Sequence, residues 1–255
     1  MFPYYLEIIF LSIIQGISEF IPVSSSAHLI LISKIGKFSA QSLEIDISLH
    51  FGSLLAIVCY FFKDLVKIFE NKNILKLIVI GSMPIILAGS ALYYLEIIYK
   101  LRDIKIIAWS TLIFGLLLYI SDKKIENKNL EKDLNLKNIF IIGFFQILAF
   151  IPGASRSGIT ITSGRIIGFN RVDSAKISFF LSIPALTAAS ILGLKDFTSN
   201  NMGLNLAIIL STLFSFIFSY LTIKFLLLYL KKFTLNIFVL YRVIISLILF
   251  FMIYS

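Results

Sequence analysis

The chain has 255 residues, of which 58% are hydrophobic and 15% are charged, and its mean hydropathy is +0.96. Soluble domains are nearer half apolar and a quarter charged, so the composition excludes an ordinary soluble protein. A net charge of +9 would suggest nucleic-acid binding in a soluble chain. In a membrane protein the same excess is typical of basic cytoplasmic loops, so we expect no nucleic-acid partner.

The N-terminal segment and the cysteine content set two further limits. Residues Met1–Gly16 carry no Lys or Arg ahead of their apolar run, so the positive segment of a cleaved signal peptide is missing and we expect mature protein from Met1 onward. Glu7 is expected near an interface and in contact with water. Cys59 is the only cysteine, which excludes an internal disulfide and a metal site with several cysteine ligands.

The first half of the chain contains one broken apolar stretch and three unbroken ones. The broken stretch, Tyr4–Ile35, is interrupted by Pro and Ser, and the unbroken ones lie near Ile47–Phe62, Leu77–Ile98 and Ile106–Ile120. A helix needs about 17–25 mainly apolar residues to cross the hydrocarbon core. Each unbroken stretch therefore predicts a transmembrane helix.

The second half follows the same order. A broken stretch at Ile139–Ile167 precedes unbroken ones at Ile177–Leu194, Leu204–Ile223 and Leu235–Tyr254. Each broken stretch holds about 30 residues, enough for two half-length helices at about 1.5 Å per residue. The sequence therefore predicts an all-α polytopic membrane protein, with six transmembrane helices and two re-entrant helix–loop–helix hairpins.

A short motif relates the two halves. Phe20–Ser26 reads FIPVSSS and Phe150–Arg156 reads FIPGASR, at an offset of 130 residues, with Gln15 and Gln146 upstream. Because each copy has three crossings, an odd number, the second copy is expected to be inverted in the membrane. Inverted repeats with broken helices place their site near the midplane, so the two hairpin tips are expected to meet there.

This interpretation predicts one integral membrane domain, with a first repeat over about residues 1–122 and a second over about 138–255. On this topology 15 of the 23 Lys and Arg residues lie on one face and six lie on the other. The richer face is expected in the cytoplasm, which places both termini and the mouth of the first hairpin outside. Its basic loops are Lys63–Lys76, Lys123–Lys137, Arg165–Lys176 and Lys224–Lys232.

The first tip combines acid, base and hydroxyl groups within apolar sequence. Gln15 and Glu19 are four residues apart and share a helix face. Pro22 is expected to end that helix, and Ser24–Ser26 to cap the next one, whose free backbone N–H groups form an anion site. His28 follows on the returning helix.

The second tip adds a guanidinium to the same arrangement. Arg156 lies among Gly153, Ser155 and Ser157, and the planar fork of an arginine suits bidentate binding of phosphate. An arginine in the hydrocarbon costs about 2.5–3.5 kcal/mol on insertion scales, so it is usually paired or functional. Its expected partners are Glu19 and a bound phosphate.

Simpler interpretations of the same residues stay open. Glu19 and Arg156 could form only a structural ion pair, and His28 could be a hydrogen-bonded interior histidine. The serines could do no more than cap helices. His50, in the first unbroken stretch, could line a site or merely pack.

Together the tips resemble the paired signatures of the undecaprenyl-pyrophosphate phosphatase family, also called bacitracin-resistance proteins. That family carries a Glu/Gln-rich motif leading into Pro-Val-Ser-Ser-Ser-x-His, matched here from Gln15 to His28, and Pro-Gly-x-Ser-Arg-Ser-Gly, matched from Pro152 to Gly158. The resemblance extends over essentially the whole chain. One departure is that many members have glutamate where this chain has Gln15.

The resemblance implies hydrolysis of undecaprenyl pyrophosphate to undecaprenyl phosphate plus phosphate in the bacterial inner membrane, from the outward face. That reaction recycles the lipid carrier for peptidoglycan synthesis and confers bacitracin resistance. The substrate and the lipid bilayer are the expected partners, and the sequence leaves the oligomeric state open, a homodimer included. By analogy with the family, a divalent cation, Mg²⁺ or Ca²⁺, is expected as cofactor, held by Glu19 with Gln15 as a neutral ligand.

The expected roles divide into two sets. Glu19, Ser25, His28 and Arg156 are the predicted catalytic residues. The predicted substrate-binding residues are Ser24, Ser26, Gly153, Ser155 and Ser157. The nucleophile is either Ser25, with His28 as base or leaving-group acid, or a water activated by Glu19.

The main alternative is a carrier or flippase for a phosphorylated prenyl lipid, because secondary transporters are built from inverted repeats with broken helices. Glu19 and His28 favour the enzyme, since binding needs only donors whereas hydrolysis also needs a proton acceptor. A purely structural membrane protein would leave both intramembrane polar clusters without a purpose.

Overall fold

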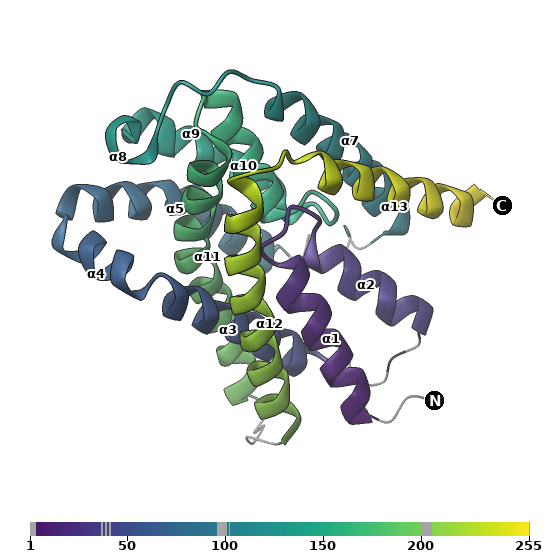
Figure 1. The fold of residues 1–255 in the computed structure, drawn as a ribbon. Helices are drawn as coiled ribbons and strands as arrows, with labels where there is room; N and C mark the ends of the chain where they lie inside the picture. The colour runs from purple at the N-terminus through teal and green to yellow at the C-terminus, as the bar shows by residue number, and fades with distance from the viewer. Residues whose placement is uncertain are drawn as a thin grey trace.

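The protein is a bundle of helices in a computed structural model that describes residues 4–36, 38, 40, 42–95, 101, 103–199 and 206–254 (Figure 1). In chain order the helices are α1 Tyr4–Ser18, α2 Ser25–Gly36, α3 Leu43–Tyr60, α4 Phe62–Glu70, α5 Lys72–Tyr94, α7 Ile104–Asp122, α8 Leu130–Asp133, α9 Leu136–Gln146, the 3-10 helix η1 Ile147–Phe150, α10 Arg156–Ile167, α11 Arg171–Ser199, α12 Leu206–Leu230 and α13 Asn236–Tyr254. The described residues contain one isolated β-bridge, between Lys128 and Phe169. The predicted all-α class is confirmed.

Each of the six predicted spans corresponds to a long helix. By length and composition, α5, α7, α11, α12 and α13 can each cross a membrane. The sixth, α3, passes this test together with α4, from which it is bent by 73°. The bend was not predicted; α4 carries four charged residues in nine, which oppose continuation into hydrocarbon. The chain is therefore a multi-pass membrane protein; Ile98 and Leu204, predicted span ends, lie outside the described residues.

Both predicted hairpins are present as pairs of short helices. The first is α1 and α2, with 15 and 12 residues, and the second is α9 with η1 followed by α10. At about 1.5 Å per residue, none of these helices reaches the roughly 30 Å of the hydrocarbon core. In the first hairpin the helix ends at Ser18, four residues before the expected stop at Pro22, and residues 19–23 form the turn.

The two halves exchange helices in their packing: one helix of each half lies against helices of the other half. Helix α12 packs against α1 and α3, and its counterpart α5 packs against α9 and α11. Two further contacts, α3 with α11 and α7 with α13, join counterparts directly. This exchange is the pattern expected if the halves are related by a two-fold axis. The inverted orientation and the repeat boundaries stay predictions.

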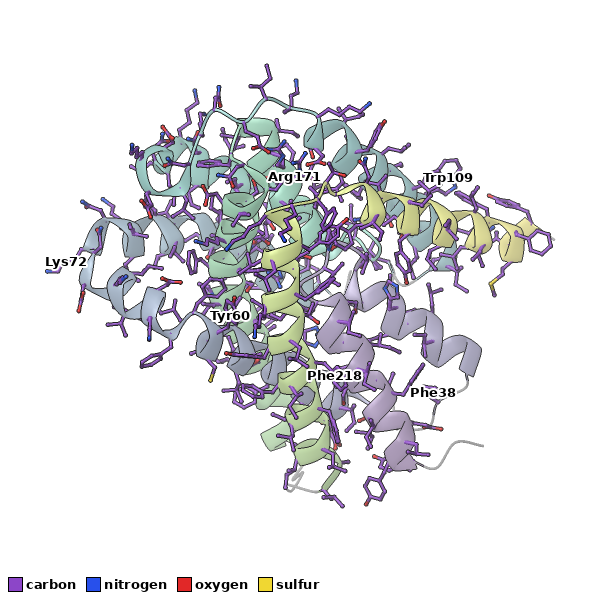
Figure 2. All side chains as sticks on the ribbon, in the orientation of Figure 1. Phe38, Tyr60, Lys72, Trp109, Arg171 and Phe218 are labelled. Atoms are coloured by element: carbon purple, nitrogen blue, oxygen red, sulfur yellow. The ribbon has the colours of Figure 1, made fainter. Side chains whose placement is uncertain are left out.

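Aromatic and aliphatic side chains pack the interior close to the first tip. Phe20 is completely buried and contacts Phe179 edge-to-face at 5.4 Å between ring centroids. Large apolar side chains cover the outside, and Figure 2 shows them projecting along α12 and α13. Trp109, Leu247 and Phe251 are more than half exposed, which suits lipid contact rather than water.

The expectation for Glu7 is wrong. Its side chain is buried, with 3% of the residue exposed, and its Oε2 accepts a hydrogen bond of 2.8 Å from the backbone N–H of Ala40. The carboxylate therefore anchors the connection after α2 instead of facing water. The apolar sequence around Glu7 does not indicate this partner, which lies 33 residues away in the sequence.

Candidate active site at the meeting hairpin tips

The two tips share an unusual backbone conformation. Ser24 and Ser155 have φ angles of 78° and 71°, and each directly precedes the first residue of its returning helix. Non-glycine residues rarely adopt positive φ, and such conformations cost about 1–3 kcal/mol and cluster at functional sites. In each tip this serine also contacts the serine two residues later, with Oγ–Oγ distances of 3.3 Å to Ser26 and 3.2 Å to Ser157.

This structural equivalence changes the offset between the two copies of the motif at their serines. The matched conformation pairs Ser24 with Ser155 and therefore Ser25 with Arg156, an offset of 131 rather than 130. The cause is one extra residue in the second tip: Val23 alone separates Pro22 from its serine, whereas Gly153 and Ala154 both follow Pro152. A hydroxyl in one tip thus occupies the position of the guanidinium in the other.

The tips touch each other, as predicted. The backbone N–H of Gly153 donates to Ser24 Oγ at 3.2 Å, and Ser157 Oγ donates to the carbonyl of Ile21 at 3.0 Å. These bonds join residues that are 129 and 136 positions apart. Two half-length hairpins therefore form one composite turn region inside the bundle.

Glu19 is the centre of the polar cluster at this contact. Its Oε1 accepts a hydrogen bond of 2.8 Å from Arg156, and the two charges form a salt bridge. Its Oε2 accepts from Ser25 Oγ at 2.6 Å and from Gln15 Nε2 at 3.0 Å. His50 Nε2, on α3, lies 3.9 Å from the same oxygen. The carboxylate is 7% exposed, so these partners replace water around a buried charge.

His28 lies at the same tip but has different partners. Its Nδ1 is 2.7 Å from the carbonyl oxygen of Ser24, and its Nε2 is 2.5 Å from the hydroxyl of Tyr241 on α13. The hydroxyl of Ser25 donates to Glu19 instead. In this state the proton acceptor next to Ser25 is the carboxylate and not the imidazole.

The residues predicted to bind substrate divide by exposure. Ser24, Ser155 and Ser157 are buried and bonded within and between the tips, and Ser155 Oγ caps α10 by accepting from the N–H of Gly158 at 3.1 Å. Ser26 is exposed. The structural role of the buried serines is therefore to shape the tips, and their contact with substrate stays a prediction.

Comparison with known proteins fits this geometry. A family model described as bacitracin resistance protein BacA matches residues 8–248. The chain belongs to this family. It is 53% identical over 256 residues to an undecaprenyl-diphosphatase of Pelagibacter ubique, with both chains fully covered. An undecaprenyl-diphosphatase of Elusimicrobium minutum is 40% identical, with 92% of this chain and 93% of the relative covered. The family resemblance inferred from the two tips is confirmed.

Arg242 lies within the predicted span Leu235–Tyr254, and the sequence assigned it no role in the site. Arg242 is completely buried on α13, and its guanidinium donates to four backbone carbonyls. Those of Pro22, Gly153 and Ala154 accept at 3.1, 2.6 and 3.0 Å, and that of Thr111 on α7 accepts at 3.2 Å. One side chain therefore holds both tips. The available signal was an arginine within a long apolar span, which is rarely without a function.

The residues around Glu19 can hold a metal ion only if a bound substrate supplies further oxygen atoms to coordinate it. Among the described residues, no three His, Cys, Asp or Glu side chains are close enough to bind a metal by themselves. Gln15 Oε1 is buried and has no hydrogen-bond partner in the described part of the chain. Mg²⁺ usually takes one or two carboxylates and fills its shell with water and substrate phosphates. Glu19 and Gln15 fit that pattern when a pyrophosphate supplies the remaining oxygens.

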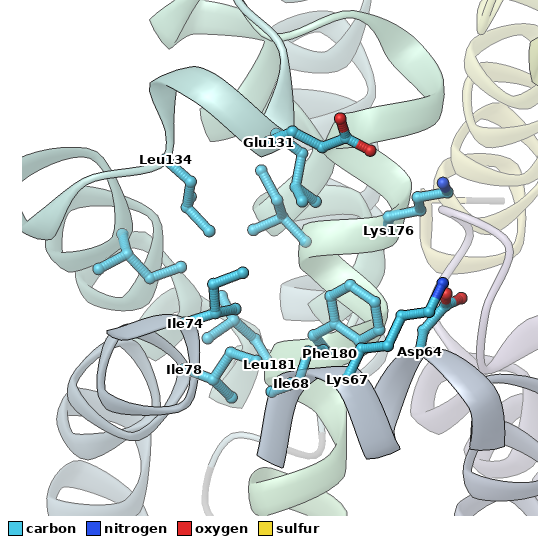
Figure 3. A pocket seen from close by; sticks show the side chains of 13 residues that line it. Asp64, Lys67, Ile68, Ile74, Ile78, Glu131, Leu134, Lys176, Phe180 and Leu181 are labelled. Carbon is cyan, nitrogen blue, oxygen red and sulfur yellow. The ribbon is translucent and has the colours of Figure 1, made fainter. Parts of the chain in front are cut away.

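A hollow elsewhere in the molecule is separate from this site. It lies between α4, α5, α8 and α11, where Ile68, Ile78 and Phe180 form an apolar wall and Lys67 and Lys176 lie at the rim (Figure 3). None of the predicted site residues lines it. Its charged residues belong to the basic loops and not to the hairpin tips.

Proposed function

We propose that the protein hydrolyses undecaprenyl pyrophosphate to undecaprenyl phosphate and phosphate. The two relatives above, which cover all and 92% of this chain, carry the name of this activity. The observation that supports it most strongly is the convergence of a carboxylate, a hydroxyl and a guanidinium from two hairpins, Glu19, Ser25 and Arg156. A phosphoryl-transfer site needs a base, a positioned nucleophile and a charge that stabilises the equatorial oxygens.

Arg156 would bind the terminal phosphate of the substrate. Its guanidinium is partly buried, with 11% of the side chain exposed, and it donates to Glu19 and to the carbonyl of Ser178. A phosphate that approaches this pair can accept two parallel hydrogen bonds from the guanidinium. Because the fork keeps its charge at any working pH, it can stabilise the charge that spreads over the oxygens in the transition state.

Ser25 is the nucleophile that the hydrogen bonds favour. Its proton passes to Glu19 Oε2, 2.6 Å away, while its oxygen bonds to the terminal phosphorus. The bond between that phosphorus and the bridging oxygen breaks, and undecaprenyl phosphate leaves. Glu19 releases the serine proton to solvent as this product leaves. Water then attacks the phosphorus of the serine phosphoester, Glu19 takes a proton from the water and passes it to the Ser25 oxygen as the phosphoester bond breaks, and phosphate is released. The rival path, direct attack of a water activated by Glu19, uses the same carboxylate and leaves no phosphoserine.

A divalent cation is part of this proposal. Glu19 and Gln15 are the residues that would hold it together with the pyrophosphate oxygens. When bound, such an ion supplies positive charge that neutralises the phosphates. The carboxylate of Glu19 and the unpartnered oxygen of Gln15 support this assignment, which a chelator tests directly.

The proposed setting is the inner membrane of a bacterium, with the mouth of the first hairpin facing outward and the basic loops facing the cytoplasm. The distribution of Lys and Arg supports this orientation. Outward access suits recycling of a lipid carrier that is released outside the cell membrane during cell-wall synthesis.

Phosphate release from undecaprenyl pyrophosphate by purified protein in detergent tests the function. We expect release that stops with a chelator and resumes when Mg²⁺ or Ca²⁺ is added in excess. The carrier alternative predicts binding of the lipid without release of phosphate. Binding without release would therefore contradict the proposed hydrolysis.

A further inference from the structure

Both ring nitrogens of His28 are occupied, and the two partners differ in chemistry. Nδ1 lies 2.7 Å from the carbonyl oxygen of Ser24, one turn earlier on the same tip. Nε2 lies 2.5 Å from the hydroxyl of Tyr241, which is 213 residues away on α13. The two rings are also stacked, with centroids 5.6 Å apart and an interplanar angle of 12°.

These partners determine which nitrogen carries the proton. A carbonyl oxygen can only accept, so Nδ1 must carry a hydrogen and donate it to Ser24. In the neutral imidazole, Nε2 is then the acceptor, and the Tyr241 hydroxyl donates to it. If Nε2 is protonated, the same hydroxyl accepts instead, because a phenol can do either. Nε2 is therefore the one nitrogen of His28 that can exchange a proton without breaking the bond to Ser24.

The position of Tyr241 is itself fixed by its neighbour. Arg242, the next residue on α13, is completely buried and bonded to carbonyls of both tips. The helix cannot slide along the tips without breaking those bonds. Tyr241 is 39% exposed and lies at the edge of the cluster, where a bound lipid head group could reach it.

We propose that Tyr241 is a positioning residue for His28, an assignment that rests on the proposed hydrolysis. Its hydroxyl donates to Nε2 in the Nδ1–H tautomer that the Ser24 carbonyl sets, and its stacked ring holds the imidazole plane beside the first tip. His28 is three residues from Ser25 on α2, so both side chains lie on the same helix face. Tyr241 thereby keeps Nε2 as a proton acceptor: once Nε2 has taken a proton from water, the imidazolium can give that proton to the oxygen of the departing undecaprenyl phosphate and return to the neutral tautomer.

The tautomer can be observed directly, because the chain contains only two histidines. Ring nitrogen-15 spectra of labelled protein, with His50→Gln as the assignment variant, report which nitrogen of His28 is protonated. We expect a protonated Nδ1 and a hydrogen-bonded, unprotonated Nε2 at neutral or higher pH. In Tyr241→Phe we expect the Nε2 resonance to move to the position of a nitrogen without that donor. An Nε2–H tautomer in the unmutated protein, or an unchanged resonance in Tyr241→Phe, would overturn the proposal.

The kinetic test is a double-mutant cycle between Tyr241→Phe and His28→Ala, measured as phosphate release. Removing the group that orients a functional histidine typically costs on the order of 10- to 100-fold, and we expect a loss near the lower end, in kcat and not in KM. In the His28→Ala background the same substitution should have no further effect, because its target is gone. Tyr254→Phe, at the exposed end of the same helix, is the matched control and should retain full activity.

The outcomes separate this inference from the proposed function. If the unmutated protein releases no phosphate, the hydrolase assignment fails, and the nitrogen-15 spectra still test the contact. If the protein is active but the two substitutions act independently, Tyr241 has a role unrelated to His28 and the positioning proposal is wrong. Full activity of Tyr241→Phe would contradict it equally.

Discussion

The carboxylate of Glu19 lies 2.8 Å from the guanidinium of Arg156, although 137 residues separate them in the sequence. They come from different hairpins, so the pair forms only when the two tips meet. Within the bilayer, each residue alone would carry a costly uncompensated charge. The pair thus stabilises the contact between the tips and places a phosphate-binding group beside a proton acceptor.

We expect Glu19→Gln to lower phosphate release by on the order of 10²-fold or more, because the amide cannot accept the proton of Ser25 or bind a cation as a carboxylate does. The substitution keeps the size of the side chain and leaves an acceptor for Arg156. The variant should therefore purify as folded protein. Initial rates at saturating lipid, compared with the unmutated enzyme, give the measurement. Retention of more than about a third of the rate would remove Glu19 from the chemistry.

Ser25→Ala should abolish turnover if the serine is the nucleophile, and a phosphoserine should be trapped on the unmutated protein by rapid quench with labelled substrate. Mass spectrometry of the peptide that carries Ser25 gives the readout. Ser12→Ala is the matched control, because its hydroxyl only donates to the carbonyl of Ile8 on the same helix. If Ser25→Ala stays active and no phosphoserine forms, water activated by Glu19 is the nucleophile.

Arg242 is predicted to contribute mainly to the stability of the folded protein. A lysine cannot reach four carbonyls at once, and hydrogen bonds to charged groups contribute about 1.5–3 kcal/mol each. We expect Arg242→Lys to cost about 3 kcal/mol of stability, which corresponds to a fall in the thermal midpoint of about 6–12 °C for a chain of this size. Fluorescence of Trp109, the single tryptophan, follows unfolding in detergent. A midpoint equal to that of the unmutated protein would show that the carbonyl bonds do not hold the tips.

The two ends of α7 test the orientation. Lys105 and Ile125 are both exposed and lie near the start and just after the end of that helix. In a Cys59→Ser background, an impermeant thiol reagent should label Lys105→Cys in intact cells. It should label Ile125→Cys only after the membrane is opened. The reverse pattern would place the basic loops outside the cell and overturn the assigned topology.

Much of the fold was predictable because it follows from apolar length. The spans and the broken stretches could be located from hydropathy and from Pro and Ser at the breaks, and the tips from a repeated motif. The bend between α3 and α4 was missed, because it depends on a short charged helix that resembles a loop in sequence. The burial of Glu7 was missed for a different reason: its partner is a backbone N–H brought close only by folding.

The candidate site, too, could be predicted only in part. Glu19, Ser25 and Arg156 could be chosen because ionisable and nucleophilic residues are conspicuous in apolar sequence, and they lie in contact. The contacts of His28 with Tyr241 and of His50 with Glu19 could not be predicted from the sequence. They join the tips to α13 and α3, which come close to the tips only in the folded protein. The exact pairing of Ser25 with Arg156 also required the backbone, because one extra residue shifts the second tip.

Phosphate release by purified Arg156→Ala tests the composite site most directly. Removing a preorganised charge-stabilising donor typically lowers turnover by about 10²–10³-fold, so we expect release to be nearly abolished. Arg156→Lys should recover only a small part, because an ammonium cannot form two parallel hydrogen bonds to a phosphate. Both variants should insert and purify as folded protein, since the carbonyl bonds of Arg242 still hold the tips. Arg156→Ala should lower the thermal midpoint, because the buried Glu19 loses its charge partner. If folded Arg156→Ala releases phosphate within about threefold of the unmutated rate, the second tip does not bind the phosphate and Arg156 is only a structural partner of Glu19.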